Sequence, residues 1–243
     1  MPTRSPSAAR VATELRCMLK AGGSAEHAKG VQWFFKEEIR SHGWYAAALR
    51  KAAIQTRREI LKQHDLKFLL RVADGLFSGR VLEEKTFAVL LLEKLTIDLG
   101  DAEFRLFGSW LKRVSSWADH DALVYYLIGP MIVAEPKRLR AAFRWAKSRD
   151  RWHRRAACVA LIQGTRRKMF FPELVRLSNV LLLDDDDMVQ KGLGWLLRET
   201  AKANPQLTVP YLMKVRRRAP RLVLRTACET LPASLRTRIL RSV

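Results

Sequence analysis

The 243-residue chain contains few cysteines and no long apolar run. Cys17, Cys158 and Cys228 are isolated, with no CxxC spacing and no even count, so we expect reduced core thiols rather than disulfides. No stretch approaches the roughly 20 uninterrupted apolar residues that span a bilayer. The first 16 residues lack the apolar core of a secretion signal. Together these absences predict a cytoplasmic protein without a membrane partner.

Acidic side chains are also scarce. Asp and Glu number 24 against 45 Lys and Arg, which gives a formal net charge of +21 and a pI near 10.7. Such an excess costs self-repulsion, and a polyanionic partner is its usual compensation. Nucleic acid is therefore the first candidate partner, an anionic membrane surface the second, and solubility alone the third.

Strand-like alternation is nearly absent, and helical periodicity replaces it. Apolar residues recur every three or four positions, as in Phe104, Phe107, Leu111 and Val114. Glycine, proline and polar clusters interrupt the pattern every dozen to twenty residues, so we expect twelve to fifteen helices of ten to eighteen residues. The periods are too short for a coiled coil, and the helices are too many for a four-helix bundle.

The fold class that remains is all-α: an α-solenoid of stacked antiparallel helical hairpins, each hiding its apolar face against its neighbours. A HEAT-like period of about 40 residues fits the chain loosely. Its expected repeats run over residues 83–115, 119–147, 150–183 and 187–218. No linker divides the sequence, so we expect residues 1–243 to form a single HEAT-like domain.

The segment "MVQKGLGWLLRE" (188–199) predicts an amphipathic helix with an unusual outer face. At 100° per residue, its apolar face comprises Val189, Leu193, Leu196 and Thr200. The opposite face carries Lys191, Trp195, Arg198 and Lys202. A tryptophan among three cations on this outer face adds nothing to the hydrophobic core of the protein, and this favours a binding role.

Other helices repeat the basic pattern. Arg140, Arg144 and Lys147 form a stripe opposite the apolar residues of 139–146, and "RDRWHRRAA" (149–157) and "KVRRRAPR" (214–221) continue it. One such stripe is usually a solvated face. Several in successive hairpins of a curved solenoid predict a basic concave face.

Three short motifs carry the candidate chemistry. In "SSWADHDALVYY" (115–126), Asp119 suits a helix N-cap and Asp121 the first turn. "RWHRRAACVALI" (151–162) places paired arginines at a helix start, where a phosphate or a carboxylate can dock. The aspartates at 184–187 could bind a metal, but an N-cap followed by first-turn acids is the favoured interpretation.

In this order the motifs resemble the AlkD-type DNA alkylation-repair glycosylases, which are built from HEAT-like repeats. The resemblance rests on Trp117 with Asp121 four residues later, on the Trp-x-Arg-Arg of 152–155, and on "MVQKGLGWLLRE". It is sharp between about residues 110 and 200. The N-terminal "VQWFFKEEIRSHGW" (31–44) resembles the family's early helix pair more loosely.

The resemblance implies that Asp121 is the catalytic carboxylate and that Trp117 and Trp195 are aromatic walls of the cleft. It implies that a monomer excises N3- and N7-alkylated purines from duplex DNA in base excision repair, with no metal or other cofactor. The expected DNA-binding residues are Arg154, Arg155, Lys191, Arg198, Lys202, Arg140, Arg144 and Trp33. Trp33, His42 and Trp44 stand where the family tends to have a tyrosine and smaller polar groups.

The chemistry agrees with that implication. Loss of a cationic alkylpurine leaves an oxocarbenium-like sugar, which a nearby carboxylate stabilises. Asp119 competes with Asp121 for this role, and the four-residue step from Trp117 favours Asp121. Two other functions stay open: a HEAT-like protein that grips damaged or branched DNA without cleavage, and a scaffold for an acidic protein.

Overall fold

The computed structural model describes residues 6–241, and two compact units make up the chain, the first ending at Leu127 and the second beginning at Ile128. The described residues form helices and no strand, and their one β-bridge joins Arg40 to Val81. The all-α class is therefore confirmed. No helix among residues 6–241 is long and apolar enough to cross a membrane. The single domain expected for residues 1–243 stays a prediction.

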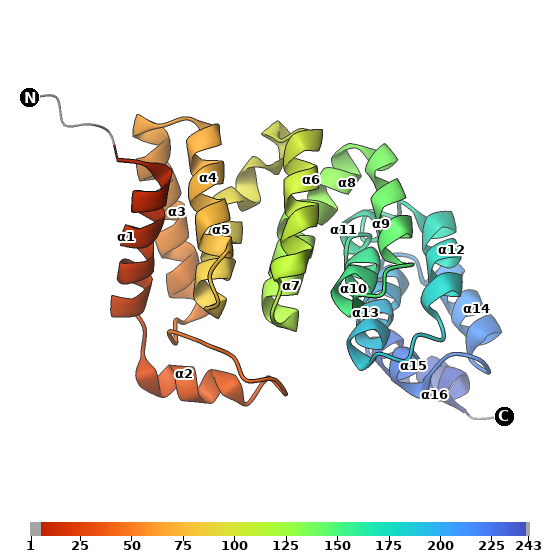
Figure 1. Ribbon diagram of the computed structural model, residues 1–243. Helices are drawn as coiled ribbons and strands as arrows, with labels where there is room; N and C mark the ends of the chain where they lie inside the picture. The colour runs from red at the N-terminus through yellow and green to blue at the C-terminus, as the bar shows by residue number, and fades with distance from the viewer. Residues whose placement is uncertain (1–5, 242–243) are drawn as a thin grey trace, which may run out of the picture. The chain divides into compact units, whose positions relative to one another are not determined.

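The first unit is built around one buried helix (Figure 1). Its elements are α1 (Ala8–Ala21), α2 (Ala25–Gln32), α3 (Ala46–Gln63), α4 (Leu66–Phe77), α5 (Leu82–Leu92), the 3-10 helix η1 (Glu93–Asp98), α6 (Asp101–Trp110), the 3-10 helix η2 (Leu111–Arg113) and α7 (Trp117–Leu123). From Glu83 to Leu92 every residue of α5 except Thr86 is buried, because α3, α4 and α7 pack around it. Short turns make α3, α4 and α5 successive antiparallel neighbours.

The second unit is also built around one helix. A π-helix, η3 (Val124–Ile128), leads into it. Its elements are α8 (Gly129–Ala134), the 3-10 helix η4 (Pro136–Arg138), α9 (Leu139–Trp145), α10 (Arg151–Val159), α11 (Ile162–Thr165), α12 (Phe171–Leu181), α13 (Asp187–Ala203), α14 (Pro205–Val215), α15 (Arg221–Ala227) and α16 (Ala233–Leu240). Helix α13 packs chiefly against α10 and α15, and it also contacts α11, α12 and α14.

Two glycines explain how closely the neighbours approach α13. A Cβ at Gly192 would lie 3.1 Å from Cγ of Arg155 in α10, and a Cβ at Gly194 would lie 2.6 Å from Cβ of Thr226 in α15. A glycine inside a helix costs about 1 kcal/mol relative to alanine. The "GLG" of the sequence is thus a packing feature, since it lets two helices approach the α13 backbone.

Two sequence-based expectations need correction. Helices α7, α9 and α15 have only seven residues each, shorter than the expected minimum of ten. For α7 and α9 the reason is that 3-10 or π turns take up part of the periodic segments. Cys17 is exposed on α1 rather than in the core, whereas Cys158 and Cys228 are buried as expected. The expected repeats nevertheless begin close to the starts of α5, α7, α10 and α13.

Candidate catalytic carboxylate and nucleic-acid interface

Helix α7 begins at Trp117, one residue after its N-cap, Ser116. Asp119 is the third helical residue and completes a capping box with Ser116. Asp121 is therefore the fifth residue of the helix. The expectation that Asp119 is the N-cap and Asp121 a first-turn acid is wrong by three positions, because the serine before Trp117 provides the cap.

Asp119 is a buried structural residue with both carboxylate oxygens occupied. Its Oδ1 accepts hydrogen bonds from the backbone N–H (2.7 Å) and the hydroxyl (2.6 Å) of Ser116. Its Oδ2 accepts from the backbone N–H of Ser115 (2.9 Å) and from Nζ of Lys85 (3.0 Å). Asp119 and Lys85 are 1% and 2% exposed. This pair ties α5 to the start of α7.

Asp121 remains as the carboxylate of α7 that reaches solvent. Its side chain is 16% exposed, and its Oδ1 lies 2.7 Å from Nδ1 of His120, which is fully buried. When Nδ1 carries a proton, it donates to this carboxylate and orients it. Asp121 is therefore an acidic side chain that is held in place by His120 and partly exposed to solvent.

Trp117 lies against the segment that follows α2. Its ring stacks on Phe35 at a centroid distance of 5.0 Å, and its indole N–H donates to the carbonyl of Phe34 at 3.4 Å. Trp33 in the same segment is 90% exposed. The first unit thus places Trp33, Phe34 and Trp117 in one local aromatic region, with Asp121 one helical turn beyond Trp117.

Two of the residues that depart from the family pattern, His42 and Trp44, have folding roles. The indole N–H of Trp44 donates to the carbonyl of Leu19 at 2.7 Å. The buried carboxylate of Glu83 accepts from the backbone N–H groups of His42 (2.8 Å) and Gly43 (2.9 Å). Gly43 adopts φ 79°, a left-handed conformation that suits glycine. The loop of residues 42–44 is therefore held in place by hydrogen bonds within the first unit.

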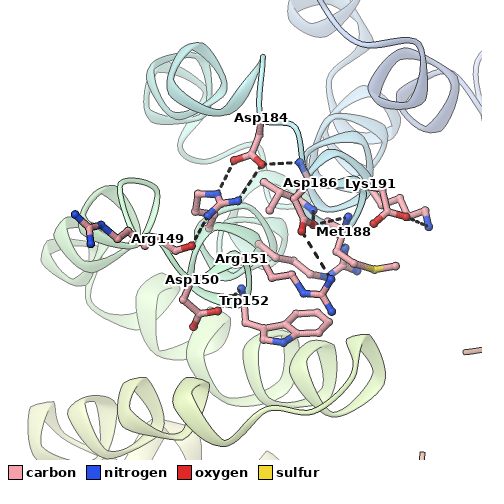
Figure 2. A network of polar contacts seen from close by, with 12 residues as sticks. Arg149, Asp150, Arg151, Trp152, Asp184, Asp186, Met188 and Lys191 are labelled. Atoms are coloured by element: carbon pink, nitrogen blue, oxygen red, sulfur yellow. Dashed lines mark hydrogen bonds and ion pairs between the residues drawn. The ribbon is translucent and has the colours of Figure 1, made fainter. Parts of the chain in front are cut away.

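In the second unit, Arg154 holds the starts of two helices together by bonding to Asp184, which is labelled in Figure 2. Its Nε and Nη2 donate to Asp184 at 2.6 and 3.2 Å, and its Nη1 donates to the carbonyls of Ser148 (3.1 Å) and Arg149 (2.9 Å). The hydrogen bond with Asp184 raises the pKa of Arg154 despite partial burial. Its donors are thus engaged within the fold, and its expected phosphate contact stays a prediction.

Arg155 is 5% exposed, and its Nη1 donates to the carbonyl of Met188 at 2.5 Å. That contact joins α10 to the first turn of α13. Asp186 caps α13 by accepting from the backbone N–H groups of Met188 (2.8 Å) and Val189 (3.2 Å), and Asp187 occupies the first turn. The favoured interpretation of the aspartate run is confirmed.

The two expected faces of α13 are confirmed. Val189, Leu193 and Leu196 are fully buried and Thr200 is 2% exposed. The partly or fully exposed side chains of 190–202 are Gln190, Lys191, Trp195, Arg198 and Lys202. Trp195 therefore sits within a narrow open stripe on an otherwise enclosed helix.

The cations of that stripe are matched by carboxylates. Lys191 pairs with Asp187 at 3.2 Å, and Lys202 pairs with Glu199 at 2.9 Å. Arg198 bridges Glu199 at 3.3 Å and also pairs with Glu229, which follows α15. The three expected DNA-binding cations thus face three carboxylates, so the stripe carries little net charge.

Glu199 is central to this network. Burial raises its pKa, but the hydrogen bonds and charges of Lys202 and Arg198 outweigh that effect and hold the pKa below its ordinary value. The sequence interpretation counted the cations and left out Asp187 and Glu199, which lie within four residues of them, whereas the pairing of Arg198 with Glu229 becomes apparent only in the folded arrangement.

Uncompensated charge lies elsewhere in the second unit. Arg140 and Arg144 on α9 are exposed, with no ion pair to a described carboxylate. Residues 205–241 contain nine Lys and Arg and a single acid, Glu229, which pairs with Arg198. The exposed cations of this segment are Lys214, Arg217, Arg218, Arg221, Arg225, Arg236, Arg238 and Arg241. We call them the C-terminal basic surface. None pairs with a carboxylate in the part of the chain that the structure describes.

No group of three or more His, Cys, Asp or Glu side chains among residues 6–241 is arranged to hold a metal ion. The site residues above are acidic, aromatic and cationic side chains.

Comparison with solved structures shows similar folds. A predicted DNA alkylation repair enzyme from Enterococcus faecalis matches with a TM-score of 0.77 and 19% identity, covering 87% of this chain and 97% of that chain. AlkD2 from Streptococcus mutans matches with a TM-score of 0.63 and 20% identity, covering 91% of this chain and 100% of that chain. The protein smu.31 from Streptococcus mutans UA159 matches with a TM-score of 0.55 and 20% identity, covering 76% of this chain and 100% of that chain. No curated protein matches the chain.

The sequence itself places the chain in a family. The family described as DNA alkylation repair enzyme matches residues 15–231, which run from within α1 through α15 and end before α16. The AlkD-like fold and the residues that suggested it are thus part of one continuous match. The chain belongs to the DNA alkylation repair enzyme family.

Proposed function

We propose that the protein is a monofunctional DNA glycosylase that releases N3- and N7-alkylated purines from duplex DNA, with Asp121 as its catalytic carboxylate. One observation carries the assignment. Asp121 is held by the buried His120 and stays partly open to solvent, whereas both oxygens of Asp119 are occupied inside the fold. The competition between the two acids therefore favours Asp121.

The reaction needs little acid assistance, because an alkylated purine is cationic and leaves readily. As the glycosidic bond breaks, its electron pair goes to the purine and positive charge develops at C1′ of the sugar. The Asp121 carboxylate stabilises this charge, and it accepts a proton from the water that adds to C1′. Trp117, in the same unit as Asp121, attracts the cationic base or sugar by about 0.5–2 kcal/mol, and the open ring of Trp195 in the second unit offers a DNA base a stacking surface of similar strength.

Duplex DNA is held through its phosphates in this proposal. The uncompensated cations at Arg140, Arg144 and the C-terminal basic surface supply the attraction, because they have no carboxylate to give up. Lys191, Arg198 and Lys202 contact phosphates only by exchanging their acidic partners. Six neutralised phosphates give a slope of log affinity against log salt of about −5.

The direct test is release of 7-methylguanine or 3-methyladenine from alkylated duplex DNA under single-turnover conditions. We expect release by the wild type and a loss of about a hundred-fold in Asp121→Asn, the lower end for removal of one preorganised group, with DNA affinity little changed. Asp185→Asn is the matched control, because Asp185 is exposed and lies outside the site. It should keep wild-type activity.

The outcomes of this test distinguish a DNA glycosylase from a protein that only binds DNA. Wild-type protein that binds alkylated DNA but releases no base would establish the non-catalytic function, a DNA-binding protein of the same fold. Full activity in Asp121→Asn would remove Asp121 from the mechanism. A slope near −1 would instead point to a protein partner rather than DNA.

A further inference from the structure

The first unit contains a pocket of about 420 Å³ with several charged residues in its lining, and the proposed chemistry does not use it. It lies between the segment before the Arg40–Val81 bridge, the turn from α4 to α5, and the start of α7. Its charged lining consists of Arg40, Arg80, Lys85, Arg113 and Glu38. A volume of this size is within the range of small-ligand sites.

Backbone contacts hold the segments that carry Arg40 and Arg80 next to each other. Arg40 and Val81 form a β-bridge, and the N–H of Leu82 donates to the carbonyl of Arg40 at 2.9 Å. Arg80 is the neighbour of Val81, so Arg40 and Arg80 enter the pocket from adjacent segments. The bridge makes their backbone spacing a property of the fold.

The four cations of the lining differ in how they are neutralised. Lys85 pairs with Asp119, and Arg113 pairs with Asp74 at 2.6 Å. Arg40 and Arg80 are exposed and have no hydrogen bond or ion pair from their guanidinium groups within the described residues. Two guanidinium groups are therefore available to an anion at one pocket.

Glu38 is the single carboxylate in the lining, and it is exposed without a described partner. With Lys85 and Arg113 already paired, the two unpaired arginines against one acid leave the lining positive. Guanidinium groups bind phosphate oxygens through paired N–H donors, and the hydroxyls of Ser78 and Ser115 add polar groups to the wall. The ligand chemistry that fits is a phosphate group.

We propose that this pocket binds a phosphate of the DNA backbone through Arg40 and Arg80. The inference rests on the proposed function, because it treats duplex DNA as the substrate. Lys85 lines the pocket and also bonds to Asp119, which completes the capping box of α7. A phosphate bound here is thereby anchored beside the start of the helix that carries Trp117 and Asp121.

The test compares three variants for affinity to an unmodified duplex, measured by fluorescence anisotropy at several salt concentrations. Arg40→Ala/Arg80→Ala should bind at least ten-fold more weakly, with a salt slope shallower by about 0.9, the value for one phosphate. Arg105→Ala/Lys112→Ala removes the same charge from exposed cations of the same unit outside the pocket. This control should change affinity by less than two-fold. Glu38→Gln should bind more tightly than the wild type.

Equal weakening in the pocket variant and the control would overturn the proposal, since only overall charge would then matter. Titration with inorganic phosphate, followed by ³¹P NMR, separates the two sources of phosphate. Phosphate binding that depends on Arg40 and Arg80, with unchanged DNA affinity, would assign the pocket to a free phosphate ligand and refute the DNA contact. The two proposals can also fail separately. If the wild type releases no base but the pocket variant still loses DNA affinity, the phosphate site is supported and the glycosylase function is rejected. Circular dichroism checks that each variant folds.

Discussion

The ammonium group of Lys85 and the carboxylate of Asp119 form an ion pair of 3.0 Å in the core of the first unit, 34 residues apart in the sequence. Serine hydroxyl and backbone groups satisfy the rest of the carboxylate. A buried pair of this kind contributes little net stability when whole, but the removal of one charge leaves the other unpaired. The contribution of this ion pair to stability is therefore measured by removing one of its two charges.

Asp119→Asn should destabilise the protein by about 3–5 kcal/mol, because the buried ammonium group of Lys85 loses the carboxylate with which it pairs. Urea unfolding followed by circular dichroism measures this loss. Asp185→Asn, an exposed control, should stay within about 0.5 kcal/mol of the wild type. A loss below about 1 kcal/mol in Asp119→Asn would mean that the residue acts as a simple helix cap.

Two glycine variants should change stability in opposite directions. Gly194→Ala places a Cβ 2.6 Å from Thr226, and overpacking of about 1–3 kcal/mol should exceed the helix gain of about 1 kcal/mol. Gly30→Ala in α2 meets nothing within 4 Å and should stabilise by about 0.5–1 kcal/mol. Thermal unfolding of both variants tests the pair. A Gly194→Ala protein as stable as the wild type would contradict the close approach of α13 and α15.

The three thiols should react at different rates. Burial raises the pKa of Cys158 to about 12 and that of Cys228 to about 11, whereas Cys17 is exposed. A thiol reagent at pH 8 should modify Cys17 alone in the folded protein, as mass spectrometry of the peptides can determine. Modification of Cys158 before unfolding would argue against its burial.

The same pKa values predict loss of stability at alkaline pH. A thiol whose folded pKa lies above its unfolded value of about 8.5 stays protonated in the folded state while the unfolded chain releases its proton. Stability therefore falls as pH rises from about 8.5 towards 12. Cys158→Ala should flatten the dependence of the urea midpoint on pH between 8 and 10. An unchanged dependence would contradict the prediction.

Charge reversal should weaken DNA binding most where no carboxylate compensates the cation. Arg217→Glu/Arg218→Glu on the C-terminal basic surface should weaken binding more than Lys191→Glu/Lys202→Glu, since the latter cations already face acids. Anisotropy titrations at fixed low salt compare the two double variants, which carry the same change in charge. The opposite order would place the main DNA contact on α13.

Glu199→Gln should tighten DNA binding and lower stability, because it frees Lys202 and Arg198 from their shared acid. The depressed pKa of Glu199 gives the pH dependence. Its stabilising effect is complete above the unfolded pKa of about 4.3 and is lost as pH falls through the lower folded value. The difference in unfolding free energy between the variant and the wild type should therefore shrink below pH 4. A constant difference down to pH 3 would argue against the ion-pair network.

Local periodicity predicted what depends on neighbouring residues. The buried face of α13 and the exposure of Trp195 follow from the 100° step between residues, and the cap at Asp186 follows from its position before an apolar run. The position of Asp119 was misjudged because Ser116, a better cap, precedes it by three residues. Its pairing with Lys85 had no local signal at all.

Long-range partners also changed the interpretation of charge. The sequence shows Lys191, Arg198 and Lys202 on one face, but Glu229 reaches Arg198 from beyond another helix. Arg154 similarly finds Asp184 thirty residues away. Counting cations along one helix overestimates its attraction for phosphate, whereas the scarcity of acids in residues 205–241 is visible in the sequence and persists in the fold.

Gly192 and Gly194 lie about 200° apart around the axis of α13, so α10 and α15 press on the helix backbone from nearly opposite sides. A turn of the helix by a single residue would push Lys191 or Leu193 into a space where even a methyl group is crowded. Rotation about the helix axis is consequently blocked in both directions. The face of α13 from which Trp195 projects is therefore fixed by two positions that lack a side chain, and a partner that stacks on its ring meets a helix that does not rotate about its axis.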